Sequence, residues 1–173
     1  LGDVYKRQVY LSVGEKIKFA PQADWGNDFG GQATVNDEAG AGLVADTDNN
    51  LEAKNAGWYL LHIVNGVERI VNVLAPNVYL TGDTAPGGWS IDETGKFVVP
   101  ETKDGEFVSP AFVASKEVRM CVNFGGYDWW KVEFIVLDGK IVYRGNGGDQ
   151  ERVSVSEGQK AYLNFTDGTG TFK

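Results

Sequence analysis

The residues of this chain best suited to chemistry are tryptophans that stand in polar, glycine-rich stretches. Asp24-Trp25 lies about forty residues before a strand-like segment that ends at Asn65-Gly66. Asp128-Trp129 lies about forty residues before a second such segment, which ends at Asp167-Gly168. The two copies are offset by roughly 100 residues, a period typical of whole domains. The sequence therefore predicts a small β-domain present twice, each copy with an aromatic residue available for binding.

Trp129 and Trp130 precede Lys131 and an apolar segment, residues 132–136. Successive residues of a strand point to opposite faces. Trp130 would then share the core face with Val132, while Trp129 would be exposed on the other face with Lys131 and Glu133. An exposed indole next to a long hydrogen-bond donor suits a sugar ring, because the apolar ring face stacks and the hydroxyls bond to the donor.

The turn before this segment leaves two registers open. A two-residue hairpin at Gly125-Gly126 would pair Trp129 with Val122 and turn the indole toward the core. A three-residue loop would pair Trp129 with Asn123 on the polar face. We prefer the second register because it agrees with the alternation after Trp130. The alternative that both tryptophans only pack in the core or at its rim stays open.

The other tryptophans each have two interpretations. Trp25 lies in a turn-rich stretch, residues 23–31, and could be an exposed platform or a plug at the end of a sandwich. Trp89 follows a Pro-Gly-Gly loop and is a ligand contact or a lid on the core, of which we favour the lid. Trp58 opens a strand-like segment and is expected to pack.

Composition excludes several classes of function. The formal net charge is -8, which disfavours nucleic acid and attachment to anionic lipid. No apolar run approaches the roughly 20 residues of a membrane-spanning helix. The single cysteine, Cys121, permits no internal disulfide, and the single histidine, His62, leaves little room for histidine-based catalysis or a multi-histidine metal site. Both residues are expected in strands.

The sequence predicts neither a bound cofactor nor enzymatic activity. Asp46–Glu52 spaces oxygens like the start of a calcium loop, but Leu51 stands where such a loop needs glycine and the distal glutamate is missing. This run is predicted to be a polar turn. Carboxylates are plentiful, yet none lies in a stretch that marks it as half of a glycosidase pair.

Most of the chain reads as short strands between turns. The strand-like segments are rich in β-branched and aromatic residues. Asn65-Gly66, Asp138-Gly139 and Asp167-Gly168 each lie between two such segments and favour tight hairpins. No sustained helical period is present. The predicted class is all-β, with tandem antiparallel immunoglobulin-like β-sandwich domains.

Pro76 marks the expected domain boundary. The first domain would span residues 9–75 and the second, complete domain residues 77–173. When the copies are aligned on their Asp-Trp pairs, little in the first corresponds to residues 77–115. The first domain is therefore predicted to be N-terminally truncated, with exposed sheet edges. Residues 1–8 resemble no domain start and receive no function.

One segment resembles a known family. Residues 77–90 run as a strand, Gly82-Asp83, a loop and Gly88-Trp89. This segment resembles the opening of a repeat in the SusE/SusF family, starch-binding outer-membrane lipoproteins of Bacteroidetes polysaccharide-utilisation systems. In that family a Lys-Phe-type strand precedes a tryptophan. Here Lys18-Phe19 precedes Trp25, whereas the second copy has Asn123 where lysine is usual.

The resemblance implies a non-catalytic protein that stacks a polysaccharide or oligosaccharide on tryptophan, with starch or another α-glucan the leading ligand. It also implies surface display at the cell outer membrane through a lipid anchor upstream of this chain, which would be the C-terminal part of a longer protein. Outer-membrane glycan-uptake components are the implied protein partners. The alternative function is a β-sandwich spacer without a ligand. The implied ligand-binding residues are Trp129, Lys131, Asn123, Trp25, Lys18 and Trp89.

Overall fold

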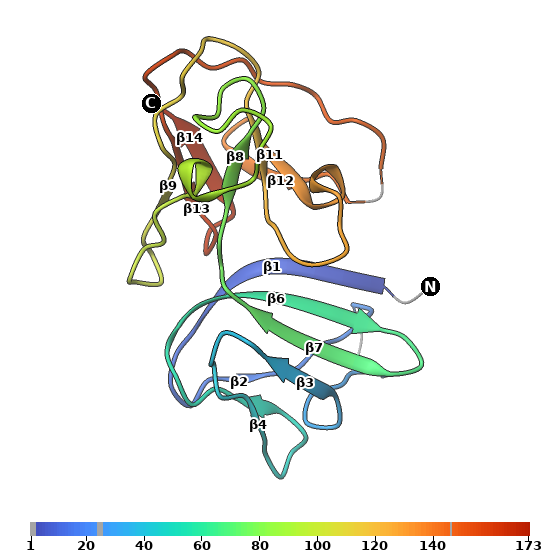
Figure 1. The fold of residues 1–173 in the computed structure, drawn as a ribbon. Coiled ribbons are helices and arrows are strands. Elements are labelled where there is room, and N and C mark those ends of the chain that lie inside the picture. The colour runs from blue at the N-terminus through green and yellow to red at the C-terminus, as the bar shows by residue number, and fades with distance from the viewer. Residues whose placement is uncertain (1–2, 24–25, 146) are drawn as a thin grey trace. The chain divides into compact units, whose positions relative to one another are not determined.

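The computed structural model describes residues 3–23, 26–145 and 147–173 (Figure 1). Its described residues form strands and two short 3-10 helices, so the all-β prediction is confirmed. The chain divides into two compact units. The first is Leu1–Pro76 with Glu101–Lys103, and the second is Asn77–Pro100 with Asp104–Lys173. Each unit is described below by itself.

The first unit contains a four-stranded sheet, in the order β1-β6-β7-β3, and a three-stranded sheet, in the order β2-β5-β4. The strands are β1 (Asp3–Leu11), β2 (Lys16–Ile17), β3 (Thr34–Asp37), β4 (Val44–Ala45), β5 (Leu51–Glu52), β6 (Gly57–Asn65) and β7 (Arg69–Leu74).

The core of the first unit follows from strand alternation. Tyr59, Leu61 and Ile63 occupy alternate positions of β6 and join one buried cluster with Val71 and Val73 of β7. Buried side chains from the other sheet and its loops complete this cluster, among them Leu51 and Phe29. The two sheets therefore enclose a shared apolar core, which is the arrangement of a β-sandwich.

Two features of the first unit differ from the expectation. β1 begins at Asp3, before the predicted start at Val9, and pairs with β6 along its whole length. The sequence predicts that the first unit lacks a counterpart of residues 77–115. β1 supplies part of one, because it pairs with the penultimate strand of its unit as the strand at Phe107–Val108 does in the second unit. In addition, β3 pairs with β7 in parallel rather than antiparallel. The chain between these two strands supplies the long crossover that a parallel pair requires.

The second unit contains one seven-stranded sheet, in the order β8-β10-β11-β12-β14-β13-β9. Its elements are β8 (Tyr79–Thr81), η1 (Glu93–Gly95), β9 (Phe107–Val108), β10 (Arg119–Cys121), η2 (Trp129–Val132), β11 (Glu133–Leu137), β12 (Lys140–Tyr143), β13 (Ala161–Asn164) and β14 (Thr169–Phe172).

This sheet closes on itself through the segment after η1. Lys96 bridges to Tyr79 at one end of the strand order, and Val98 bridges to Val108 at the other. The two edges of the sheet are thereby covered, which protects them from pairing with other chains. Inside, the ring of Phe165 contacts the rings of Phe107 and Phe134, with centroids 4.9 and 5.8 Å apart. Aromatic side chains from the two halves of the sheet thus form the core.

The three predicted hairpin dipeptides all lie at hairpins. Leu137 pairs with Lys140, so Asp138-Gly139 is a two-residue turn, and both of its φ angles are positive, at 49° and 74°. This is the backbone that an Asp-Gly pair favours. The Asn65-Gly66 and Asp167-Gly168 hairpins have longer loops, closed by the pairs Asn65–Arg69 and Asn164–Thr169.

His62 and Cys121 are buried strand residues, as predicted. Burial lowers the pKa of His62 below its ordinary value, and the Asn72 amide lies 3.0 Å from its Nδ1. Burial, followed by the nearby Glu133 charge, raises the pKa of the Cys121 thiol to about 12.

Cys121 is therefore expected to be inert in the folded protein. At pH 8 a disulfide reagent such as DTNB should leave the native thiol unmodified, because only the thiolate attacks and this thiol is both protonated and covered. In denaturant the same reagent should react completely. Equal labelling rates in the native and the denatured protein would show that β10 is not buried.

Candidate functional site

A glycine-based loop after β8 presents Trp89. Gly82 has a φ of 87°, a conformation that residues with a Cβ rarely adopt, and its N–H donates to the Gly88 carbonyl at 2.9 Å. A Cβ at Gly82 would also lie only 3.3 Å from the Arg119 side chain. The loop holds Trp89 with 55% of its surface exposed. The prediction that Trp89 is a lid on the core is therefore wrong.

Trp129 and Trp130 lie in a 3-10 turn rather than in a strand. They open η2, where the Lys131 N–H donates to the Asp128 carbonyl at 3.0 Å, and strand β11 begins only at Glu133. Strand alternation therefore does not extend back to the tryptophans. Trp130 is 39% exposed and Trp129 is half-buried, so the prediction that Trp130 belongs to the core is wrong.

Neither predicted hairpin register is present. Cys121 pairs with Glu133, and the Val122 N–H donates to the Val132 carbonyl at 3.3 Å. The connection is longer than a hairpin turn because it contains η2. Glu133, which alternation placed on the exposed face with Trp129, is consequently buried.

The aromatic side chains converge on the surface of the second unit. The Trp89 and Trp129 rings have centroids 5.6 Å apart and planes inclined by 54°. The Arg119 guanidinium lies 5.5 Å from the first centroid and 5.6 Å from the second. Such distances allow cation–π attraction. Arg119 therefore helps to fix the angle between the two indoles.

Trp130 has cationic neighbours of its own. The Lys131 ammonium lies 5.0 Å from its ring centroid and the Arg144 guanidinium 5.3 Å. Lys131 also forms an ion pair with Asp128 at 3.4 Å. The third indole is thus supported by two charged side chains while part of it stays exposed.

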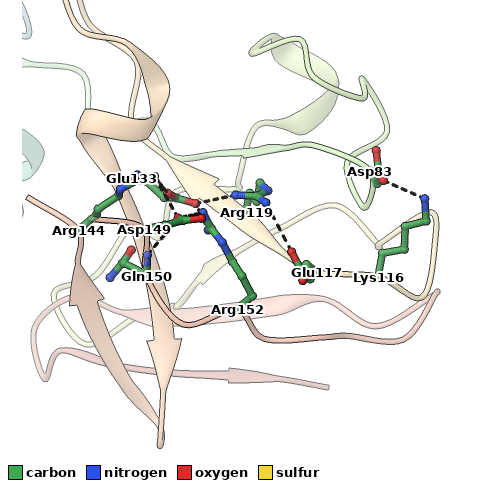
Figure 2. Close-up of polar contacts among 9 residues, drawn as sticks. All are labelled: Asp83, Lys116, Glu117, Arg119, Glu133, Arg144, Asp149, Gln150 and Arg152. Atoms are coloured by element: carbon green, nitrogen blue, oxygen red, sulfur yellow. Dashed lines mark hydrogen bonds and ion pairs between the residues drawn. The ribbon is translucent and has the colours of Figure 1, made fainter. Parts of the chain in front are cut away.

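Beneath the indoles lies an ionic network around Glu133 (Figure 2). Its side chain has 0% exposure and forms ion pairs with Arg119 at 3.7 Å, with Arg144 at 2.9 Å and with Arg152. Asp149 pairs with Arg144 at 3.3 Å and also with Arg152. Burial of a carboxylate is tolerated only with such compensation.

Together these side chains line an open groove with a cavity volume of about 450 Å³. This volume falls within the range of small-molecule sites. A second depression, of about 300 Å³, shares Trp89 and Arg119 with the groove and extends to Asp83 and Lys116. The Lys116 ammonium, 2.8 Å from Asp83, holds the pKa of that carboxyl below its usual value. The groove is lined by Trp89, Arg119, Trp129, Trp130, Arg144, Asp149 and Arg152.

The structure brings some of the predicted site residues together and separates others. Trp89 and Trp129 line one groove, and Lys131 lies at its rim against Trp130. Asn123 is exposed two residues after β10 and does not line the groove. Lys18 belongs to the first unit, where it pairs with Asp28 at 3.6 Å, and Trp25 lies outside the described residues.

Sequence reasoning missed the charged half of the site. Arg119 stands between apolar residues of one strand-like segment, and Glu133 stands between Val132 and Phe134 in the next. A charge within such a segment is rarely buried unless it has a partner. That pattern was the available signal for an ion pair, whereas Arg144, Asp149 and Arg152 lie in an irregular stretch that gives none.

The acidic run Asp46–Glu52 begins with a polar turn, as predicted, and ends in β5, where Leu51 is buried. The Asp46 carboxylate accepts hydrogen bonds from the Asp48 and Asn50 N–H groups at 2.9 and 2.8 Å. Lys16 pairs with the same carboxylate at 2.8 Å and holds its pKa well below the usual range. Across the described part of the chain, no group of three or more His, Cys, Asp or Glu side chains could hold a metal ion. No described helix is long and apolar enough to cross a membrane.

The chain has two β-sandwich units, and the second has an exposed groove lined by aromatic side chains. This combination is typical of binding modules. The chain belongs to the SusF/SusE family of starch-specific carbohydrate-binding modules, whose model matches residues 3–70 and 77–171. This confirms the resemblance drawn from residues 77–90. Carbohydrate-binding modules are non-catalytic, which agrees with the expectation that the chain is not an enzyme.

Two comparisons identify relatives from Bacteroides thetaiotaomicron. Outer membrane protein SusF is 50% identical over 169 residues, which cover 93% of this chain and 35% of that protein. The crystal structure of SusF matches with a TM-score of 0.91 and 45% identity, over 98% of this chain and 40% of the SusF chain. The chain thus spans about a third of the curated relative's length.

The position of Trp130 can be tested by comparing it with Phe134, which is fully buried in the same unit. Trp130→Ala should cost less than about 1.5 kcal/mol of unfolding free energy because much of the ring already contacts solvent. Phe134→Ala should cost about 3–5 kcal/mol as a large-to-small core change. Urea unfolding of the two variants measures the difference. Equal losses of unfolding free energy in the two variants would show that Trp130 is a core residue.

Proposed function

We propose that the second unit binds an α-glucan of the starch class by stacking glucose rings on Trp89 and Trp129. The observation that carries this proposal is the pair of accessible indoles, 5.6 Å apart and inclined by 54°. An α-1,4-linked glucan curves, so successive sugar rings present faces at an angle to one another. Two inclined aromatic planes fit such a curve better than a flat platform does.

The charged side chains supply the polar contacts. Sugar hydroxyls both donate and accept hydrogen bonds, while a guanidinium offers several donors and a carboxylate only acceptors. Arg119, Arg144 and Arg152 line the groove as donors, and Asp149 lines it as an acceptor. Their charges largely cancel within the network, which suits a neutral ligand. Lys131 and Asn123 are proposed as contacts at the rim.

A second binding site in the first unit is also proposed, from Lys18 and Trp25. Its support is the sequence pattern that places Lys18-Phe19 before Trp25. Lys18 keeps part of its side chain accessible, so it could donate to a hydroxyl without losing its pairing with Asp28.

The cellular setting is proposed from the relatives. A protein 50% identical to this chain is named an outer membrane protein. We propose that the chain is likewise displayed on the outer membrane, held by a lipid anchor upstream of its sequence, beside components that take up glycans. The competing function, a spacer without a ligand, predicts no retention by any glycan.

Tryptophan variants test the stacking. Trp89→Ala and Trp129→Ala should each weaken binding to maltoheptaose by about 1–2 kcal/mol, since each removes one aromatic contact. Calorimetry measures the affinity, and native electrophoresis through amylopectin, dextran and xylan gels measures the choice of glycan. Val98→Ala, a change at an exposed apolar side chain of the same unit, is the matched control.

We expect the wild type and Val98→Ala to be retained in amylopectin alone, and both tryptophan variants to lose this retention. Unretarded migration of the wild type in every gel would instead favour the spacer.

A further inference from the structure

Glu133 lies at the centre of the candidate site but cannot touch a ligand there, because its side chain is fully covered. Its Oε2 accepts from Arg144 at 2.9 Å, and its Oε1 accepts from Arg152 and lies 3.7 Å from Arg119. Its backbone carbonyl also accepts from the Arg144 N–H at 3.0 Å. One residue therefore fixes three guanidinium groups.

These arginines come from three separate parts of the second unit (Figure 2). Arg119 lies on β10, Arg144 directly follows β12, and Arg152 lies between β12 and β13. Asp149 pairs with Arg144 and Arg152, but among the described residues only Glu133 contacts all three arginines. Their convergence depends on the carboxylate between them, since like charges brought together without it would repel.

Two of the guanidiniums in turn support the indoles. Arg119 lies within 5.6 Å of the centroids of Trp89 and Trp129, and Arg144 lies 5.3 Å from that of Trp130. A chain of contacts therefore runs from the buried carboxylate through two arginines to three tryptophans.

The aligned position of the first unit holds no carboxylate. Alignment of the two Asp-Trp pairs places Phe29 opposite Glu133. Phe29 is buried, bridges to Phe19 and joins the apolar core, so an aromatic residue fills the corresponding position there. An apolar residue often replaces a buried ion pair without loss of stability. The carboxylate in the second unit therefore points to a role other than stability.

We propose that Glu133 is a positioning residue of the α-glucan site. Its buried carboxylate orients Arg119, Arg144 and Arg152 so that their outer N–H groups face the groove and two of them brace the tryptophans. This inference rests on the proposed function. Glu117 also pairs with Arg119, at 3.5 Å, so the three arginines and three carboxylates have no net charge with Glu133 and carry +1 without its charge.

The test is Glu133→Gln in the full chain, with Glu151→Gln, an exposed acid in the same unit, as the matched control. Affinity for maltoheptaose should fall about tenfold in Glu133→Gln, which corresponds to about 1.4 kcal/mol, and should not change in Glu151→Gln. The near-UV circular dichroism of the tryptophans should change only in Glu133→Gln. A cooperative urea unfolding transition shows that each variant is folded.

Glu133→Asp keeps the charge but shortens the side chain, and it serves if Glu133→Gln does not fold. The affinity of Glu133→Asp for maltoheptaose should lie between those of the wild type and Glu133→Gln. If Glu133→Gln cannot be measured, the affinity of Glu133→Asp should be several-fold lower than that of the wild type. A folded Glu133 variant with wild-type affinity and an unchanged tryptophan signal would overturn the proposal. Failure of the wild type to bind would refute the proposed function instead, and the tryptophan signal would still test the positioning role.

Discussion

The pairing of Cys121 with Glu133 is the constraint on which the groove of the second unit depends. This register brings a carboxylate into the protein, where an unpaired charge would be costly. Three arginines from distant segments compensate that cost, and their long side chains reach from the interior to the surface. The same side chains that neutralise the buried acid therefore also line the groove.

The register itself depends on the 3-10 turn of η2. If the strand ran straight back from Glu133, Trp129 and Trp130 would point to opposite faces of the sheet. The turn instead lets Trp129 lean against Trp89 while Trp130 lies over Arg144. Trp89 reaches this position because Gly82 ends β8 with a positive φ and leaves space for Arg119. Two short irregular segments thus assemble a site that regular strands would have divided.

The features that sequence reasoning recovered are those set by local patterns. The strand class, the hairpin at Asp138-Gly139 and the polar turn at Asp46 each follow from a few adjacent residues, and the structure contains all three. The exposure of Trp130 and the burial of Glu133 could not be obtained in this way, because alternation was carried through a segment that is not a strand. The arginine network was out of reach for a further reason. Its members come from β10 and from the chain after β12, and no sequence spacing records that they meet around one carboxylate.

The two units share part of their strand arrangement but carry different surfaces. In each, an earlier strand pairs with the first strand of the final hairpin, β1 with β6 and β9 with β13. Each also has a bridge between the segments before and after its Asp-Trp pair, but Phe29 occupies in the first unit the place that Glu133 has in the second. There the Arg69 guanidinium lies over the Phe29 ring, 5.0 Å from its centroid. The first unit instead has Lys18 paired with Asp28. The position therefore holds an aromatic ring beside one guanidinium in the first unit and a carboxylate among three guanidiniums in the second, so the polar contacts of the two units can diverge while their sandwich fold is kept.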